Sequence, residues 1–280
     1  MPIPLDLTFA VLRGQPGSEV CDLCIQALDE TDPEIQSRCA ALLVEQAHPE
    51  GLSVLRHRFR ELSGPAREIL RQGNGSFLRA CRESLKTPDE TERLEAVACL
   101  AFLGVRGEAL GALTDALGDP SETVRIQAAH ALADIARETA GERALGHDMP
   151  PDELLIRRRQ VAEALHVALR NYRQHAQAAI LEAVLMLDPG SHKLLLDILA
   201  NPGDARRPDL QHCLEATEEP EIVPFLIKMS RDPRERLRED AARLLERRRV
   251  DPAFHQALNR FFETAPPKYL QRLATEPQTL

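Results

Sequence analysis

Few residues in this chain stand at spacings that suit metal binding or catalysis. Cys21 and Cys24 form a CxxC pair, a spacing that suits zinc ligation or redox chemistry. No second pair or histidine cluster follows nearby, and both cysteines fall within an apolar helical pattern with Leu23 and Leu28. The pattern therefore favours cysteines of a helical core, and we predict no metal site here.

A second set of possible metal ligands is formed by His147-Asp148 and Asp152-Glu153. These residues fall in a loop and at the start of the next helix, where carboxylates are favourable because a helix N-terminus carries positive partial charge. The sequence has no G-x-S-x-G, no H-E-x-x-H and no phosphate-binding glycine loop. We therefore expect no metal, no cofactor and no enzymatic activity.

The basic runs 157–159 and 247–249 suggest nucleic-acid binding at first sight. Each run stands next to acidic residues on a helix, and the second closes its helix, where positive charge is favourable. The formal net charge of −9 also argues against a general nucleic-acid binder, because phosphate contacts are made by clustered Lys and Arg. We interpret both runs as solvated helix faces and keep nucleic-acid binding only as an alternative.

The composition of the 280-residue chain fits an all-α protein. Apolar residues make up 43% and aromatic residues 4%, with no Trp, which suits stacked helices better than a β-sandwich. We find no signal peptide and no uncharged segment long enough to span a membrane. The six cysteines lie in apolar helical contexts, so we expect a cytoplasmic protein. Lysines are only four of the 35 basic residues, and this arginine excess suggests a GC-rich bacterial source.

A short phrase recurs five times and must position all of these residues. Each copy begins with Asp, Thr or Asn followed by Pro, and an Arg stands six residues after the start. The clearest copy is 119–132. Adjacent copies at Thr87 and Asp119 start 32 residues apart, and those at Asn201 and Asp232 start 31 apart. Such a period is one helical hairpin, and hairpins of this size stack into solenoids. The remaining copy begins at Asp32.

The local chemistry of the phrase predicts the start of a helix. Asp, Thr or Asn is a good N-cap, and Pro at the first helical position loses no hydrogen bond. With Glu90, Thr87 would make a capping box. After the cap, Val124, Ala128 and Leu132 recur at helical spacing and form one apolar stripe.

The pattern predicts eight helix pairs in one continuous array. We expect N-terminal repeats over 1–139, an irregular loop with a possible hinge at 140–151, and C-terminal repeats over 152–280. The units near 50–72 and 152–187 are degenerate. The predicted pairs are 18–29 with 33–47, 50–62 with 65–72, 75–86 with 89–103, 106–117 with 121–139, 152–171 with 174–187, 190–200 with 204–216, 219–231 with 233–249, and 252–264 with 267–275.

The phrase D-P-x-x-x-V-R-x-x-A-A-x-A-L resembles HEAT repeats, especially the bacterial HEAT-like type first associated with phycobilisome lyases. The resemblance implies a right-handed α-solenoid, a class whose members are mostly protein-binding scaffolds, with a minority acting on bilins or DNA. It also implies a structural ladder of Asp and Arg from successive units, interrupted at Thr87 and Asn201. Carried over to this chain, the ladder residues are Asp119, Arg93, Arg125, Asp232 and Arg238.

The residues opposite the apolar stripe of each second helix should line a concave surface. We predict a non-enzymatic scaffold or adaptor that binds a protein partner, of unknown identity, through this surface. Two alternatives stay open: a lyase-like or chaperone-like role on a bilin-type cofactor, and nucleic-acid binding. The predicted partner-binding residues are Glu95, Thr123, Gln127, His130, Asp134, Asp209, His212, Asp240 and Arg243.

Overall fold

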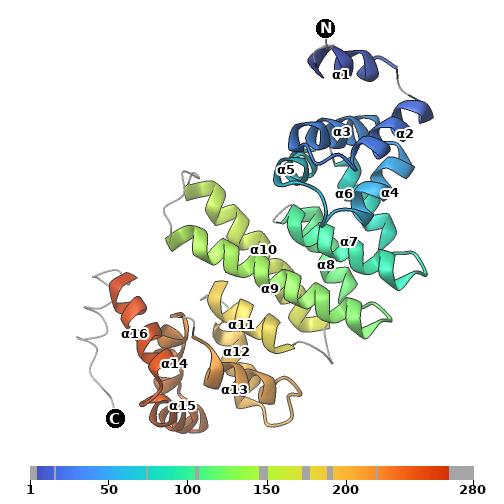
Figure 1. Cartoon of the computed structure of the whole chain (residues 1–280). Helices are drawn as coiled ribbons and strands as arrows, with labels where there is room; N and C mark the ends of the chain where they lie inside the picture. The colour runs from blue at the N-terminus through green and yellow to red at the C-terminus, as the bar shows by residue number, and fades with distance from the viewer. Residues whose placement is uncertain are drawn as a thin grey trace. The chain divides into compact units, whose positions relative to one another are not determined.

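The structure is a computed structural model that describes residues 5–15, 17–73, 75–104, 107–144, 151–171, 177–187, 192–218 and 220–264. These residues form sixteen α-helices and no strand (Figure 1). The predicted all-α class is therefore confirmed. The chain divides into two compact units, residues 1–135 and 136–280, and each is described by itself.

The N-terminal unit is a two-layer stack of helix pairs. In one layer α3 packs against α5 and α5 against α7, while in the other α2 packs against α4, α4 against α6 and α6 against α8. The unit contains α1 (Leu5–Arg13), α2 (Ser18–Ala27), α3 (Pro33–Gln46), α4 (Pro49–His57), α5 (Gly64–Gln72), α6 (Ser76–Ser84), α7 (Glu90–Leu103), α8 (Gly107–Ala116) and the first part of α9 (Glu122–Ala144).

The C-terminal unit repeats this arrangement. Here α11, α13 and α15 follow one another in one layer, and α14 packs against α15 and α16. Both units therefore have the pairwise stacking of an α-solenoid. Besides the end of α9, the unit contains α10 (Pro151–Asn171), α11 (Gln177–Leu187), α12 (His192–Ala200), α13 (Arg207–Ala216), α14 (Ile222–Ser230), α15 (Glu235–Arg248) and α16 (Pro252–Thr264).

Apolar stripes and small residues form the cores. In α9 the side chains of Val124, Ala128 and Leu132 are fully buried, as their helical spacing predicts. Close packing also sets limits elsewhere: a Cβ added at Gly51 of α4 would lie 2.7 Å from Leu43 Cδ2. The distance between neighbouring helices therefore depends on the size of the residues between them as well as on their apolar character.

The predicted helix bounds agree with the structure to within a few residues, with three differences. The helix α1 was not predicted; it buries no residue and is joined to α3 by two ion pairs, Asp6 with Arg38 at 2.6 Å and Arg13 with Glu45 at 2.8 Å. The helix α9 continues to Ala144, so part of the predicted loop 140–151 is helical, and residues 145–150 lie outside the described residues. The predicted helix 267–275 also lies outside them.

The expected capping by the first residue of the phrase holds in one copy. Asp32 is the N-cap of α3, with Pro33 in the first helical position. The helix α7 starts later, with Asp89 rather than Thr87 as its N-cap, so the prediction of a Thr87 capping box is wrong. Asp119 and Asp232 each accept a hydrogen bond from the backbone N–H two residues on, a turn that delays the helix.

The recurring arginine binds the turn of its own repeat. Nη1 of Arg125 donates to the carbonyl oxygens of Asp119 and Pro120, at 2.7 and 3.0 Å. Arg93 and Arg238 make the same pair of bonds to the residues six and five positions before them, at 2.9 to 3.0 Å. Each arginine thus satisfies carbonyls that the helix itself leaves without donors.

The expected ladder of Asp–Arg pairs between successive repeats is represented by one ion pair among the described residues. Arg93 pairs with Asp119 of the next copy, Nε to Oδ2 at 2.9 Å and Nη2 to Oδ1 at 3.2 Å. Asp232 pairs instead with Arg234 of its own copy, at 2.7 Å. The implied ladder roles of Arg125, Arg238 and Asp232 are therefore replaced by bonds within single repeats.

Candidate protein-binding groove

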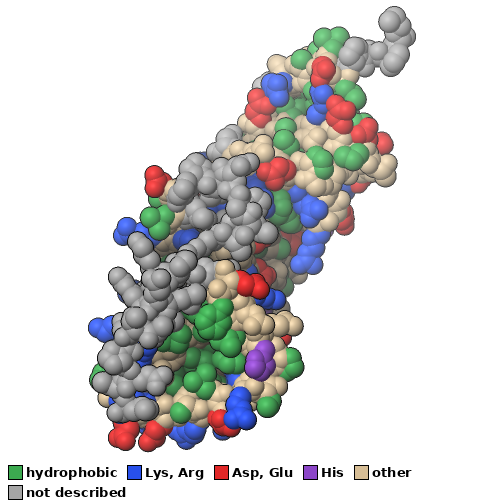
Figure 2. Space-filling model, turned by 90° about the vertical axis from the view of Figure 1, so that its left-hand side faces the viewer, with side chains coloured by type: hydrophobic (Ala, Val, Ile, Leu, Met, Phe, Trp, Pro, Cys, Tyr) green, Lys and Arg blue, Asp and Glu red, His purple; other side chains and the backbone are tan. Residues whose placement is uncertain are grey.

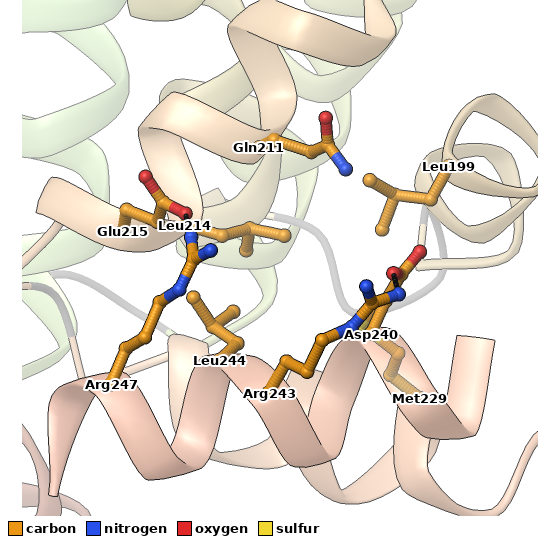
Figure 3. A pocket seen from close by; sticks show the side chains of 9 residues that line it. All are labelled: Leu199, Gln211, Leu214, Glu215, Met229, Asp240, Arg243, Leu244 and Arg247. Atoms are coloured by element: carbon orange, nitrogen blue, oxygen red, sulfur yellow. Dashed lines mark hydrogen bonds and ion pairs between the residues drawn. The ribbon is translucent and has the colours of Figure 1, made fainter. Parts of the chain in front are cut away.

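A small groove lies between the helices of the C-terminal unit (Figure 3). It has a volume of about 120 Å³ and is formed mainly by α13 and α15, with one residue each from α12 and α14. Four apolar side chains and five polar ones line it together. The apolar residues are Leu199, Leu214, Met229 and Leu244, and the polar residues are Gln211, Glu215, Asp240, Arg243 and Arg247.

Helical spacing explains why these residues meet. Residues 240, 243, 244 and 247 of α15 are three or four positions apart, which places them on adjoining faces of one helix. Residues 211, 214 and 215 of α13 share the same relation. Because α13 packs against α15, the two stripes face each other across the groove.

Two ion-pair clusters border the apolar floor. Asp240 Oδ1 accepts from Arg243 Nη2 at 2.5 Å, and its Oδ2 lies 3.5 Å from Arg207 Nη2. Glu215 Oε1 accepts from Arg247 Nη1 at 2.5 Å, which links α13 to α15. In Figure 3 Arg247 reaches from α15 to Glu215 on α13 at one end of the groove, whereas Arg243 and Asp240 both belong to α15.

The structure places two of the predicted partner-binding residues in this groove, Asp240 and Arg243. Asp209 and His212 lie on α13 outside the lining; Asp209 is half-buried and His212 is exposed. The position of His212 agrees with a surface-facing stripe on the second helices. The contribution of these residues to binding stays a prediction.

The predicted residues of the N-terminal unit do not gather in a described pocket. Glu95 lies in an ion-pair cluster that joins α7 to α4, 2.6 Å from His57 Nδ1 and 3.4 Å from Arg56 Nε. The α9 residues face outward as the assumed register requires, since none is buried. They are the exposed Thr123, His130 and Asp134 and the half-buried Gln127.

Sequence reasoning missed several groove residues. Arg247 stands four residues after Arg243 and could have been assigned to the same stripe from spacing alone. Leu199 and Met229 come from the first helices of neighbouring pairs, and only the tertiary packing brings them here. The solvated-face interpretation of 247–249 is wrong for Arg248, which is 3% exposed and donates to the carbonyls of Leu214 and Thr217.

The first arginine run, 157–159, agrees better with a solvated face. Arg159 is exposed and pairs with Glu163 at 3.0 Å. Arg158 is half-buried and donates to the carbonyl oxygen of Leu187 at 2.7 Å. On the face that Figure 2 shows, the described Lys and Arg side chains are interspersed with Asp and Glu, without a continuous basic surface.

The CxxC cysteines lie in the core of the N-terminal unit, as predicted. Cys21 and Cys24 are 0% and 1% exposed, and Cys21 Sγ lies 3.3 Å from His48 Nδ1. Burial raises the pKa of Cys21, and the hydrogen bond with Cys24, together with burial, raises the pKa of Cys39. The described residues include no group of three or more His, Cys, Asp or Glu side chains arranged to hold a metal ion.

The other predicted features fall partly outside the described residues. His147 and Asp148 are among the residues that the structure does not describe, whereas Asp152 and Glu153 are exposed in the first turn of α10. Within the described ranges, none of the helices has the length and apolarity needed to cross a bilayer.

The helix pairs and the repeated Asp-Pro-to-Arg bonds match a known kind of repeat. Residues 78–147 match the family model of HEAT repeats. This HEAT-repeat region includes the second and third copies of the phrase, and the match supports the predicted resemblance to a HEAT-repeat protein. HEAT repeats suggest a helical-repeat scaffold.

Other comparisons add little. No curated protein matches the chain. The solved structure of human deoxyhypusine hydroxylase in complex with glycerol is 16% identical, with 87% of this chain and 89% of that chain covered and a TM-score of 0.29. An engineered protein is 18% identical, with 82% and 96% covered and a TM-score of 0.26. These TM-scores are too low for either structure to inform the function.

Proposed function

We propose that the protein is a non-enzymatic scaffold that binds a protein partner on the second helices of its C-terminal unit, with the groove between α13 and α15 as the anchor point. The observation that carries this proposal is the combination of an apolar floor with a rim of ion pairs in one groove. Protein interfaces have this anatomy, with an apolar centre surrounded by polar groups that keep water out.

The fold supports the same function. Stacked helix pairs present extended surfaces on which a partner can lie across several repeats. The groove lies where two second helices, α13 and α15, pack side by side. A partner anchored there would meet the exposed Arg236 and His212 on the same two helices.

The two alternative functions receive less support. The groove holds about 120 Å³ and has no aromatic residue in its lining, whereas cofactor pockets measure roughly 300 to 1,000 Å³ and are rich in aromatic side chains. A nucleic-acid surface needs clustered Lys and Arg, and the groove lining carries as many carboxylates as guanidinium groups. We place the protein in a reducing cytoplasm because all six cysteines are free and buried.

Site-specific photo-crosslinking tests this proposal. A photoreactive amino acid replaces Gln211, whose side chain points into the groove in Figure 3, and in the control it replaces Ala242, which is exposed on another face of α15. Irradiation in the cells that make the protein should give a discrete adduct from position 211 and not from 242. Equal adducts at both positions, or none at 211, would contradict a partner in the groove.

A further inference from the structure

The most exposed charges of the groove are positive, although the chain is acidic. The side chains of Arg243 and Arg247 are 64% and 69% exposed, whereas their partners Asp240 and Glu215 are 13% and 43% exposed. Asp240 therefore lies beneath its partner Arg243, whereas Glu215 is less exposed than Arg247 but still reaches solvent. The two guanidinium groups are thus the most exposed charges of the groove, in a chain whose formal net charge is −9.

The guanidinium groups keep donors for another acceptor. Arg243 and Arg247 each use one nitrogen in the ion pairs described above, and a guanidinium carries five N–H donors. Asp240 is shared with Arg207, which lies outside the lining, so the lining itself carries two guanidinium groups and two carboxylates. Arg236, one turn before Asp240 on the same side of α15, is exposed and has no ion pair among the described residues. The positive character of the rim therefore comes from the greater exposure of its arginines rather than from their number.

The floor has room for one apolar side chain. A cavity of about 150 Å³ lined by apolar side chains holds a molecule the size of benzene, and the groove has about 120 Å³. Leu214, Met229 and Leu244 are buried at its base and supply apolar contacts only. An occupant would therefore insert a side chain of leucine, methionine or phenylalanine size between the two arginines.

We propose that the groove binds an acidic segment of another protein, with one apolar anchor side chain on the floor and Asp or Glu residues on either side paired with Arg243 and Arg247. This proposal rests on the proposed function and specifies the chemistry of the partner. The two arginines stand one helical turn apart on α15, so the flanking carboxylates can reach both while the anchor lies between them. Charge complementarity of this kind selects the partner and speeds its association.

Selection from a displayed library of random dodecapeptides on the full-length protein tests the proposal. The enriched peptides should carry Asp and Glu around a Leu, Met or Phe and should contain few Lys or Arg. As synthetic peptides, they should bind about tenfold or more weakly to the double variant Arg243→Glu/Arg247→Glu, and about as tightly as before to the matched variant Arg249→Glu. Arg249 is 75% exposed and lies on another face of the same region.

A blocking variant separates failure of this inference from failure of the proposed function. Gln211→Trp fills the groove from the partly exposed surface of α13 without changing charge. Enriched peptides that lose binding to Gln211→Trp but lack acidic residues would overturn the acidic-segment proposal and leave the groove as a protein-binding site. If no enriched peptide depends on Gln211, both proposals fail. Circular dichroism of each variant confirms that the helices are intact.

Discussion

Breaking the buried ion pair between Arg93 and Asp119 should strongly destabilise the N-terminal unit. Its side chains are only 8% and 6% exposed, and two N–O contacts of 2.9 and 3.2 Å join them. Asp119→Ala would leave a buried guanidinium group with two backbone carbonyls and no counter-charge. Removing one partner of a buried pair costs about 3–5 kcal/mol, so we expect a loss of that size in the free energy of unfolding.

Urea denaturation followed by circular dichroism measures this loss. With an m-value of about 3 kcal/mol/M, the midpoint of the transition that includes the N-terminal unit should fall by about 1–2 M. Because the chain has two compact units, the C-terminal unit can unfold in a separate transition, and that transition should keep its midpoint.

Two further variants test the physical reason. Glu45→Ala removes an exposed ion pair in which the side chain of Arg13 is 61% exposed and that of Glu45 is 51% exposed. This change should lower the free energy of unfolding by at most about 1 kcal/mol. The double variant Arg93→Met/Asp119→Leu leaves no buried charge and should recover much of the loss. The reasoning is refuted if Asp119→Ala costs less than Glu45→Ala, or if the double variant is as unstable as the sum of its single changes.

Three more predictions concern titration, backbone strain and the thiols. The hydrogen bond from Arg234 holds the pKa of Asp232 below its usual value. The stability that this carboxylate provides is therefore present above about pH 4 and is lost as the pH falls through the lowered pKa. The difference in free energy of unfolding between the wild type and Asp232→Asn, measured in urea melts, should shrink over this acidic range. Ala47 ends α3 in the left-handed region, with φ 52°, where a Cβ is unfavourable. Ala47→Gly should therefore raise the free energy of unfolding by about 0.5–1 kcal/mol, and a decrease in urea melts would contradict this reasoning. Burial raises the pKa of Cys213 to about 12, so a thiol reagent at pH 8 should label it only after unfolding, and fast labelling of the native protein would count against its burial.

Local chemistry explains why most helices could be predicted from the sequence. Apolar residues at helical spacing marked α9 and α15, and the proline phrase marked the start of α3. The later start of α7, with Asp89 as its cap, was harder to predict because two possible caps lie within three residues. The helix α13 begins at Arg207, close before Pro208, since a proline is tolerated only in the first turn.

The groove could be predicted only in part. The helical register of the repeat placed Asp240 and Arg243 on one face of α15, and both line the groove. The contribution of Met229 depends on how α14 packs, and no short-range pattern encodes that packing. Glu95 could not be placed from spacing alone, since the tertiary packing pairs its carboxylate with Arg56 and His57.

Comparing what the wild type and two tryptophan variants retain from cell extracts tests the central claim most directly. Gln211→Trp fills the groove, whereas Ala242→Trp adds the same side chain to an exposed position on another face of α15. Quantitative mass spectrometry should find one or a few proteins retained by the wild type and by Ala242→Trp but lost from Gln211→Trp. Identical sets of retained proteins from all three would contradict a partner-binding groove between α13 and α15.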